Sequence, residues 1–554
     1  DMQDSQKNFY DIQAEFESFW KNKTIEKGKG WKQFKRWEAF WENRLMPDGS
    51  FPDFGTAFEE YSDFNSAFQN QSSPPNGNWL PLGPFDHITT GSWSSGTGRV
   101  NVVVQHPFNP NIIYVGAPAG GIWKSVNAGV SWTPLSDDLA VIGISGIAIN
   151  PDNTDEIYVT TGDSDGGNTY SIGVWKSING GNTWGQAGNN FGQGNKILID
   201  PENPATIYVA SNAGLYKSSN SGSSWNQIQS GNIRDIALKP GDSQVIYAVT
   251  ASTCYVSTNG GNTFSTSTGL PGGTNRLAVT VSPAAANVVY VLAAANDWTF
   301  QGVYKSVDSG ASFTAQNTTT DIFNGSSQAW YDMAITVSDT DPNTLLAGVL
   351  NVWRSTNGGV SWTGINSWSN PSGASYTHAD IHYLNYYNGN LYCGSDGGVY
   401  RSTNNGNSFT DLSDGLQIGQ YYTIAGSQND ANTLCGGLQD NGGYAYTDGT
   451  WKCYYGADGM GSAVNSNNSD QIWGMIQNGS LYYTSNGGFN LSSAGSPESG
   501  RWITPMSYDG NNSRIVAGYN DVYEYVPGSG WNQLSTYNFP SLLSIVEVYE
   551  ANSN

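Results

Sequence analysis

The chain has few charged residues, and basic ones are scarcest. Only 12% of its 554 residues are charged, and 23 Lys and Arg stand against 46 Asp and Glu, a formal net charge of −23 at pH 7. A nucleic-acid-binding protein needs a basic surface that this balance does not supply. The composition therefore argues against DNA or RNA as a partner and indicates an acidic outer surface, as is common in exported β-proteins.

Cysteines and long apolar runs are also scarce. Four cysteines (Cys254, Cys393, Cys435 and Cys453) are too few for a disulfide framework, so we expect free thiols. No apolar run approaches the roughly 18 residues that a membrane-spanning helix needs. The sequence starts at Asp1 without a signal peptide. We therefore expect a cleaved signal and a secreted or cell-surface protein.

A short motif recurs along the chain, Ser-x-Asn/Asp-x-Gly-x-Ser/Thr-Trp/Phe, which we call the box. Its seven copies occupy residues 125–132, 177–184, 218–225, 257–264, 306–313, 355–362 and 402–409. Their final aromatic residues are 52, 41, 39, 49, 49 and 47 positions apart. A period of about 40–50 residues is typical of propellers and solenoids.

The segments between boxes predict strands. In residues 195–225, for example, Ile, Val and Tyr alternate with other residues in two runs that a Pro/Asn turn separates. About four short strands and no helix per unit predict an all-β fold of four-stranded antiparallel propeller blades. We expect each box on the hairpin between the third and fourth strands, with its Asn or Asp accepting turn amides and its aromatic packing between blades.

The first 78 residues differ from the rest. Aromatic residues recur at helical spacing in two runs within residues 1–48, separated by Gly28 and Gly30, and predict a helical hairpin whose aromatic face packs on the propeller or docks to a partner. Residues 49–78 are interpreted as a linker. The following Trp79–Gly83 resembles the fourth strand of a blade and is expected to close a ring as an outer strand.

Two arrangements of blades fit the sequence. The boxes decay after Phe409, which favours a seven-bladed propeller over residues 79–417 and a second, truncated propeller that starts in 418–554. The alternative is one ring of about ten blades over 79–554. Residues 541–554 match the first strand of a further blade, so we expect the native protein to continue.

The boxes resemble the Asp-box, or bacterial neuraminidase repeat, of sialidases, sortilin-type receptors and two-propeller xyloglucanases. Residues 377–409 and 415–443, with His-x-Asp-x-His, Asp-Gly-Gly and Gln-Asp-Asn-Gly, resemble large exported Bacteroidota surface proteins. The resemblance implies type IX secretion and contact with outer-membrane secretion machinery. The xyloglucanase resemblance lacks a matched acid in the first blade, where residues 117–121 read APAGG, and this argues against hydrolase activity.

Candidate functional residues follow from the propeller geometry, because the loops opposite the boxes gather on one face. Aromatic residues beside carboxylates and amides suit the stacking and hydrogen bonding of sugars. The ligand-binding candidates are Trp93, Asp163, Asp165, Trp298, Phe300, Trp330, Tyr331, Asp396, Gln439, Asp440 and Asp458. Each aromatic could equally fill a seam between blades.

Two patterns suggest metal ligands. His378, Asp380 and His382 would point to one side of a strand and could hold zinc. Asp163 and Asp165 could hold calcium through oxygen atoms. The alternative is a polar stack that lines the ring.

Function is open between two classes. The leading hypothesis is a secreted or cell-surface propeller that binds glycans or proteins in adhesion or polymer capture. The alternative is a glycoside hydrolase, which needs two carboxylates, with Asp297 and Asp440 as candidates.

Overall fold

The computed structural model describes residues 2, 7–26, 28–53, 56–68, 80–137, 139, 141–188, 191–537 and 539–549. These residues form 41 strands and three α-helices, so the predicted all-β class is confirmed. Two compact units divide the chain. The first unit holds residues 1–80, 99–367 and 374–414, and the second holds 81–98, 368–373 and 415–554.

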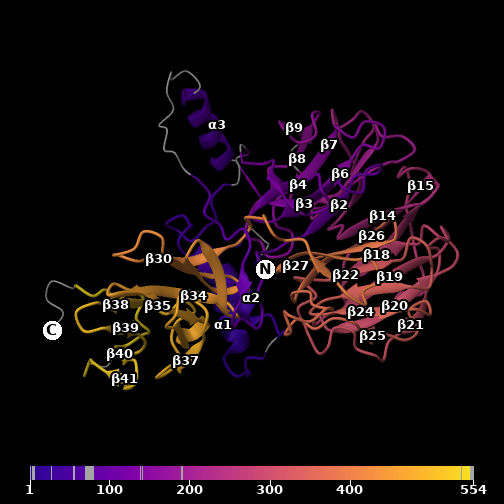
Figure 1. Ribbon diagram of the computed structural model, residues 1–554. Coiled ribbons are helices and arrows are strands. Elements are labelled where there is room, and N and C mark those ends of the chain that lie inside the picture. Colours follow the sequence, from indigo (N-terminus) through magenta and orange to yellow (C-terminus); the bar gives the residue numbers. More distant parts are fainter. Residues whose placement is uncertain are drawn as a thin grey trace. The chain divides into compact units, whose positions relative to one another are not determined.

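The first unit contains seven antiparallel sheets of four strands, each sheet built from consecutive strands (Figure 1). The first three are β2 (Val102–Gln105), β3 (Ile113–Ala117), β4 (Gly121–Ser125) and β5 (Thr133–Pro134); β6 (Ile144–Ile149), β7 (Ile157–Thr161), β8 (Val174–Ser177) and β9 (Gly185–Gly188); and β10 (Gly194–Ile199), β11 (Ile207–Ser211), β12 (Gly214–Ser218) and β13 (Asn226–Ser230). The next two are β14 (Asp235–Lys239), β15 (Asp242–Val249), β16 (Cys254–Ser257) and β17 (Ser265–Thr266); and β18 (Thr274–Val281), β19 (Val289–Ala295), β20 (Phe300–Ser306) and β21 (Thr314–Asn317). The last two are β22 (Ala334–Val337), β23 (Leu345–Gly348), β24 (Val352–Ser355) and β25 (Thr363–Gly364); and β26 (Ile381–Tyr387), β27 (Asn390–Ser395), β28 (Gly398–Ser402) and β29 (Thr410–Asp411).

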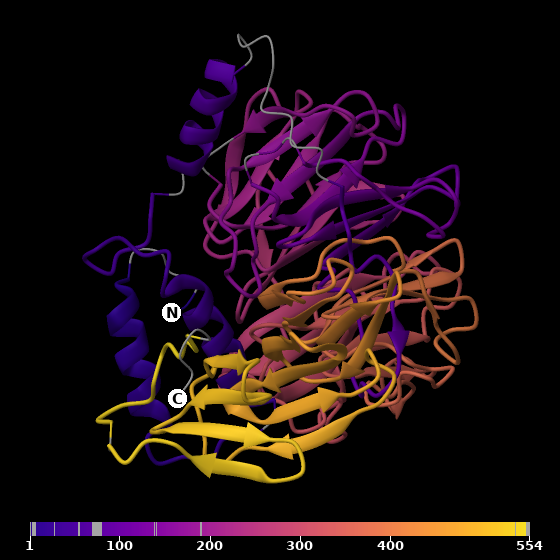
Figure 2. The ribbon, with the colours of Figure 1, turned by 60° about the vertical axis from the view of Figure 1, so that its left-hand side comes forward.

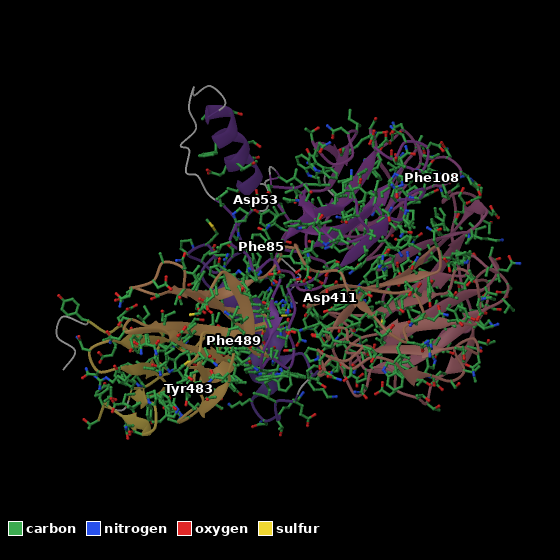
Figure 3. The ribbon with its side chains drawn as sticks, viewed as in Figure 1. Asp53, Phe85, Phe108, Asp411, Tyr483 and Phe489 are labelled. Atoms are coloured by element: carbon green, nitrogen blue, oxygen red, sulfur yellow. The ribbon has the colours of Figure 1, made fainter. Side chains whose placement is uncertain are left out.

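The seven sheets form a closed ring. The first strand of each sheet contacts the first strand of the next, and β26 of the seventh sheet contacts β2 of the first. The indole N–H of Trp132 in the first sheet donates to the Leu412 carbonyl, 2.8 Å away, after the seventh. Valine, isoleucine and tyrosine side chains fill the spaces between neighbouring sheets. Not every large apolar side chain packs in this way: Phe108, in the turn between β2 and β3, is 75% exposed (Figure 3).

Each box closes the hairpin between the third and fourth strands, as predicted. In the first box, Ser125 Oγ accepts the Gly129 N–H at 2.8 Å, and Asn127 Oδ1 accepts the Ser131 N–H at 2.9 Å. The same pair of bonds recurs in all seven boxes. Trp184 and Trp225 donate their indole N–H to carbonyls of the preceding sheet. The boxes therefore hold hairpins and seams together.

Three helices precede the ring: α1 (Phe9–Trp20), α2 (Trp31–Trp41) and α3 (Thr56–Phe68). The first two form the predicted hairpin, in which Phe16 stacks on Phe34 with ring centroids 3.6 Å apart. Helix α3 lies within residues 49–78, which we interpreted as a linker. It forms there because the Ser/Asn/Pro-rich part begins only after a stretch with good helix formers and Glu59 in the first turn.

The second unit contains three further sheets, which Figure 2 shows in orange to yellow. They are β30 (Tyr421–Gly426), β31 (Leu434–Leu438), β32 (Gly442–Thr447) and β33 (Thr450–Tyr455); β34 (Gly459–Asn465), β35 (Asn468–Ile476), β36 (Leu481–Thr484) and β37 (Ser492–Gly495), with the 3-10 turn η1 (Gln477–Gly479); and β38 (Met506–Asp509), β39 (Arg514–Gly518), β40 (Val522–Val526) and β41 (Gly530–Gln533).

Two expectations about strands in this unit are wrong. The outer strand is β1 (Ile88–Thr89), which pairs in parallel with β33, rather than Trp79–Gly83. Trp79 lies outside the described residues, and Leu80–Gly83 includes Pro81, which has no N–H for a ladder. Residues 541–549 form no strand with any described segment. They contact the third sheet through a backbone hydrogen bond, from the Leu543 N–H to the Tyr519 carbonyl at 2.8 Å.

The four cysteines are free and buried, as expected. Burial raises the pKa of the Cys254 thiol to about 11 and that of Cys435 to about 12, so these thiols stay protonated. None of the described helices is long and apolar enough to cross a membrane.

Candidate functional site

Five of the predicted site residues meet inside the first unit: Asp163, Asp165, Tyr331, His382 and Asp396. Four of them lie in loops between strands, and His382 stands at the start of β26. Arg99 and Arg276 join them, and we call these seven residues the charge cluster. Most of its side chains are buried, so its charges must be paired or neutralised within the protein.

His382 lies at the centre of the charge cluster. Its Nδ1 is 3.0 Å from Asp165 Oδ2 and its Nε2 is 2.8 Å from Asp396 Oδ1. Burial alone would lower the pKa of His382, but the hydrogen bonds and charges of these two carboxylates raise it to about 10. Both ring nitrogens therefore act as donors, and the imidazole is a cation at neutral pH.

Arginines neutralise the carboxylates on either side. Arg99 Nη2 donates to Asp163 Oδ2 at 2.5 Å, and Arg276 Nη2 lies 3.6 Å from Asp165 Oδ1. Burial raises the pKa of Asp396, but His382 and the nearby arginines outweigh it and hold that pKa well below its usual range. The Tyr331 hydroxyl also donates to Asp396, at 2.8 Å.

Helix α2 docks beside this cluster through polar groups. Arg36 Nη1 lies 4.0 Å from Asp396 Oδ2, and Gln33 Nε2 donates to Gln328 Oε1 at 3.2 Å. The Trp41 indole donates to the Gly167 carbonyl at 3.1 Å. The helical hairpin therefore packs on the propeller of the first unit, while its aromatic side chains mainly pack against one another.

Gln328 links the hairpin to two more acids. Its Nε2 donates to Asp380 Oδ1 at 2.6 Å and to Asp332 Oδ2 at 3.0 Å. Burial and the neighbouring charge of Asp380 raise the pKa of Asp332 well above its usual range. Burial and the charge of Asp396 likewise raise the pKa of Asp380. The pKa values of these two acids are therefore shifted in the opposite direction to that of Asp396.

The predicted zinc set is not assembled. His378, Asp380 and His382 do not converge because Asp380 has a left-handed φ of 65° and a bulge follows between Ile381 and Tyr383. His378 Nδ1 lies 3.2 Å from the Ala379 carbonyl, and both nitrogens of His382 face carboxylates. Both histidines instead contact the Asp396-Gly397 turn. His382 forms a hydrogen bond with Asp396. His378 packs so closely against Gly397 that a Cβ added there would lie 2.4 Å from its ring.

The calcium pair is also arranged differently from the prediction. Asp163 accepts backbone N–H groups of Asp165, Gly166 and Asn168 at 2.9–3.1 Å in addition to Arg99. Asp165 accepts from Asn101 at 3.0 Å and from His382. Because donors and cations already surround both carboxylates, the pair has the character of a structural ion network.

The predicted aromatic residues of the first unit do not form an exposed platform. Trp298 and Phe300 pack against a buried cluster that includes Phe323. Tyr331 is buried in the charge cluster, and Trp330 lies next to Gly30 of the hairpin. Asp297 is exposed and caps its own turn, where it accepts the Thr299 hydroxyl at 2.6 Å and its N–H at 3.2 Å. The seam alternative therefore describes Trp298 and Phe300.

The remaining predicted residues belong to the second unit. Gln439 and Asp440 form the turn between β31 and β32, where Asp440 has a left-handed φ of 62°. The buried Asp458 accepts the Asp440 N–H at 3.2 Å, and Tyr422 donates to Gln439 Oε1 at 3.3 Å. Trp93 packs with Tyr482, with ring centroids 5.9 Å apart. Asp440 is half-buried, on a turn that its neighbours hold in place.

Sequence reasoning did not single out Arg36, Arg99, Gln328 or Asp332 as site residues. Arg99 lies close to the start of the first blade, so a search for cations that could pair with the predicted acids would have pointed to it. Arg36 carries no such signal, because its position depends on how the helical hairpin docks.

The curated proteins that the chain resembles are xyloglucanases. The chain is similar to a xyloglucanase of Hypocrea jecorina (26% identity over 337 residues, 50% of this chain and 39% of the relative). It is similar to a xyloglucanase of a Paenibacillus species (24% over 336 residues, 51% and 32%). No family model matches the chain. The chain thus matches only about a third of the length of these relatives, 39% and 32%.

Solved structures share the fold. The GH74 xyloglucanase from Xanthomonas campestris superposes with a TM-score of 0.62 at 16% identity, over 81% of this chain and 75% of that one. The GH74 enzyme of Niastella koreensis gives a TM-score of 0.57 at 18% identity, over 80% and 74%. At these identities the likeness shows a shared β-propeller architecture.

Proposed function

We propose that the protein is a glycoside hydrolase that acts on a polysaccharide. The observation that carries the proposal is the similarity of about half of the chain to curated xyloglucanases. It favours the second of our two functional hypotheses over binding alone. Xyloglucan is therefore the first substrate to test.

Asp440 is the leading candidate for a catalytic carboxylate. It is half-buried, and Asp458 fixes the backbone of its turn. A glycosidase carboxylate must be held in place beside the scissile bond, as such a turn permits. Asp297 suits that role less well, because its carboxylate is exposed and occupied by Thr299, whose hydrogen bonds lower its pKa.

The proposal is tested by release of reducing sugar from xyloglucan. We expect the wild-type protein to release sugar and Asp440→Asn to lose about 100-fold or more of the rate, because a general acid or base contributes about 10²–10⁴-fold. Asp297→Asn should keep most of the activity. Asp308→Asn is the matched control, since Asp308 belongs to a box and Asn occupies the same place in other boxes. No release from xyloglucan or other β-glucans would count against hydrolysis.

A specific observation supports a second candidate, glycan binding without cleavage. The turn between β3 and β4 contains Pro118, Ala119 and Gly120 and has no carboxylate, whereas hydrolysis requires two. Retardation in a xyloglucan-containing gel without any sugar release would support this candidate.

We also propose that residues 418–554 begin a second propeller.

A further proposal concerns location. We propose that the protein acts outside the cell, as a type IX secretion cargo that contacts the outer-membrane machinery. The acidic composition and the resemblance of residues 377–443 support export. Detection of the protein in the medium or at the cell surface of its source organism, and its retention inside a type IX secretion mutant, would test this. Retention in neither strain would contradict the secretion route.

A further inference from the structure

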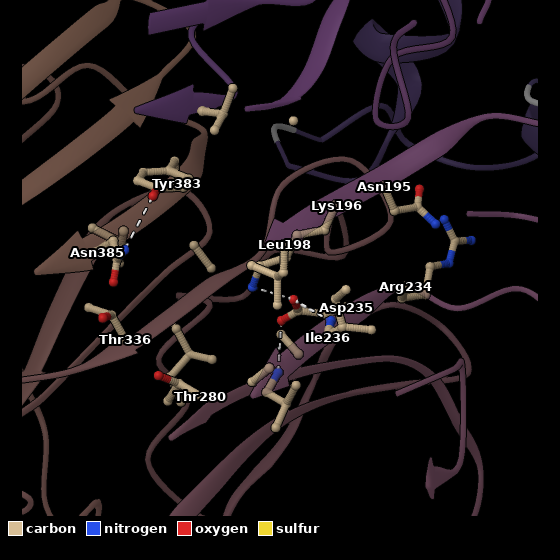
Figure 4. A pocket seen from close by; sticks show the side chains of 18 of the residues that line it. Asn195, Lys196, Leu198, Arg234, Asp235, Ile236, Thr280, Thr336, Tyr383 and Asn385 are labelled. Carbon is tan, nitrogen blue, oxygen red and sulfur yellow. Dashed lines mark hydrogen bonds and ion pairs between the residues drawn. The ribbon is translucent and has the colours of Figure 1, made fainter. Parts of the chain in front are cut away.

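A cavity of about 460 Å³ lies in the centre of the first unit. Residues of all seven first strands line it, from β2 to β26, so it is the central channel of the ring. Its volume falls within the range of about 300–1,000 Å³ that is usual for ligand pockets. Figure 4 shows Asn195, Lys196, Arg234 and Asp235 among its lining residues, together with Tyr383 and Asn385.

Arg234 is a cation that lines this channel, and the opposite charge that acts on it is that of Asp165, which also pairs with Arg276 and His382. Lys196 pairs with Asp235 at 2.7 Å, and Arg276 lies 3.6 Å from Asp165. The half-buried Arg234 side chain makes no hydrogen bond or ion pair with any residue that the structure describes; only its backbone N–H is bonded, to the Val249 carbonyl at 2.7 Å. Arg276 lines the same cavity, so two arginines border one space. Burial and the nearby charge of Arg276 outweigh the charge of Asp165 and lower the pKa of Arg234 to about 10.

Such a pair suits an oxyanion. A guanidinium offers five N–H donors in a planar fork that matches the oxygens of a carboxylate, sulfate or phosphate. A bound anion would give the Arg234 guanidinium the direct charge-assisted hydrogen bonds that it lacks among the described residues. The neighbouring Asn195 amide is already engaged, because its Nδ2 donates to the Ile233 carbonyl at 2.7 Å. Thr280, Thr336 and Tyr383 on the walls offer further hydroxyl groups.

We propose that the central channel of the first unit binds an oxyanion at Arg234, as a free ion or as the acidic group of a sugar. Arg276 strengthens the positive potential while it remains paired with Asp165. The proposal does not depend on glycoside hydrolysis, because it concerns a different set of residues from Asp440.

Calorimetric titration of the whole chain tests it, with sodium sulfate, sodium galacturonate and neutral galactose at constant ionic strength. We expect saturable binding of at least one anion and none of galactose. Arg234→Gln should weaken binding about tenfold or more, because it removes charge-assisted hydrogen bonds. Arg354→Gln is the control, since Arg354 lies outside the channel and bonds to Asn405 and Asn407.

The outcomes separate the sources of the anion. Equal binding of sulfate and galacturonate would assign a free oxyanion, and binding of galacturonate alone would assign an acidic sugar. The absence of saturable binding by the wild-type protein, or unchanged affinity in Arg234→Gln, would overturn the proposal. If Arg234→Gln does not fold, Arg234→Lys provides the test: it keeps the charge but lacks the fork, and should bind more weakly than the wild type.

Discussion

The two faces of the first unit use polar groups in opposite ways. On the box face, seven copies of one network repeat, and the turn bonds of its Ser and Asn or Asp side chains join residues two to four positions apart. On the other face, the charge cluster occurs once, and its bonds join distant parts of the chain: His382 bonds Asp165, which is 217 positions away. Stability is therefore spread over many independent groups on one face and concentrated in a few coupled groups on the other, where substitutions should not be additive.

The largest effect should come from His382→Ala. The substitution leaves Asp165 and Asp396 without their central cation, and breaking a buried ion pair in this way costs about 3–5 kcal/mol. By comparison, loss of one hydroxyl in a box, as in Ser257→Ala, should cost about 1 kcal/mol. Urea unfolding of both variants, followed by tryptophan fluorescence, measures the two free energies. Equal losses would contradict the contrast between the faces.

The second prediction tests the charge of His382 by changing the pH instead of substituting the residue. The pKa of His382 is about 10 in the folded protein and about 6.5 when unfolded, so its contribution is fully present below pH 6.5 and is lost as the pH rises through about 10. The melting temperature should therefore fall between pH 7 and pH 10. Other groups also titrate there, so His382→Gln is the reference: its fall should be clearly smaller. The same slope in both proteins would mean that His382 is not the protonated centre.

The contrast between the faces also explains what the sequence could predict. The box networks are local, so the spacing of Ser125, Asn127 and Gly129 was enough to predict their bonds and their place on the hairpins. The propeller, its four-stranded blades and the helical hairpin follow from periodicity in the same way. Even the placement of Asp163, Asp165 and Asp396 on one face follows from strand order.

The partners of these acids could not be predicted in the same way. Alternation along a strand predicted that His378, Asp380 and His382 share a side, but the left-handed Asp380 and the following bulge break that alternation. Arg36 reaches Asp396 only because α2 docks on the ring. Long-range packing determines both the direction of the histidine side chains and the contact between Arg36 and Asp396. The spacing of residues along the chain does not predict such packing.

The smallest effect concerns the backbone of the boxes. The fourth box residue is left-handed in every copy, with φ of 61° at Ala128 and 71° at Gly180. A left-handed conformation costs a residue with a Cβ about 1 kcal/mol or more relative to glycine. Ala128→Gly should therefore stabilise the protein, and Gly180→Ala should destabilise it, each by about 1 kcal/mol.

These matched substitutions in two copies of one motif test whether the boxes act independently, and urea unfolding measures both. If they do, the double variant should return to the wild-type free energy of unfolding, because the two boxes lie in different sheets. The link between them is the bond from Lys124 Nζ, just before the first box, to the Gly180 carbonyl at 3.3 Å. A double variant that differs clearly from the wild type would show that neighbouring boxes are coupled, as the groups around His382 are expected to be.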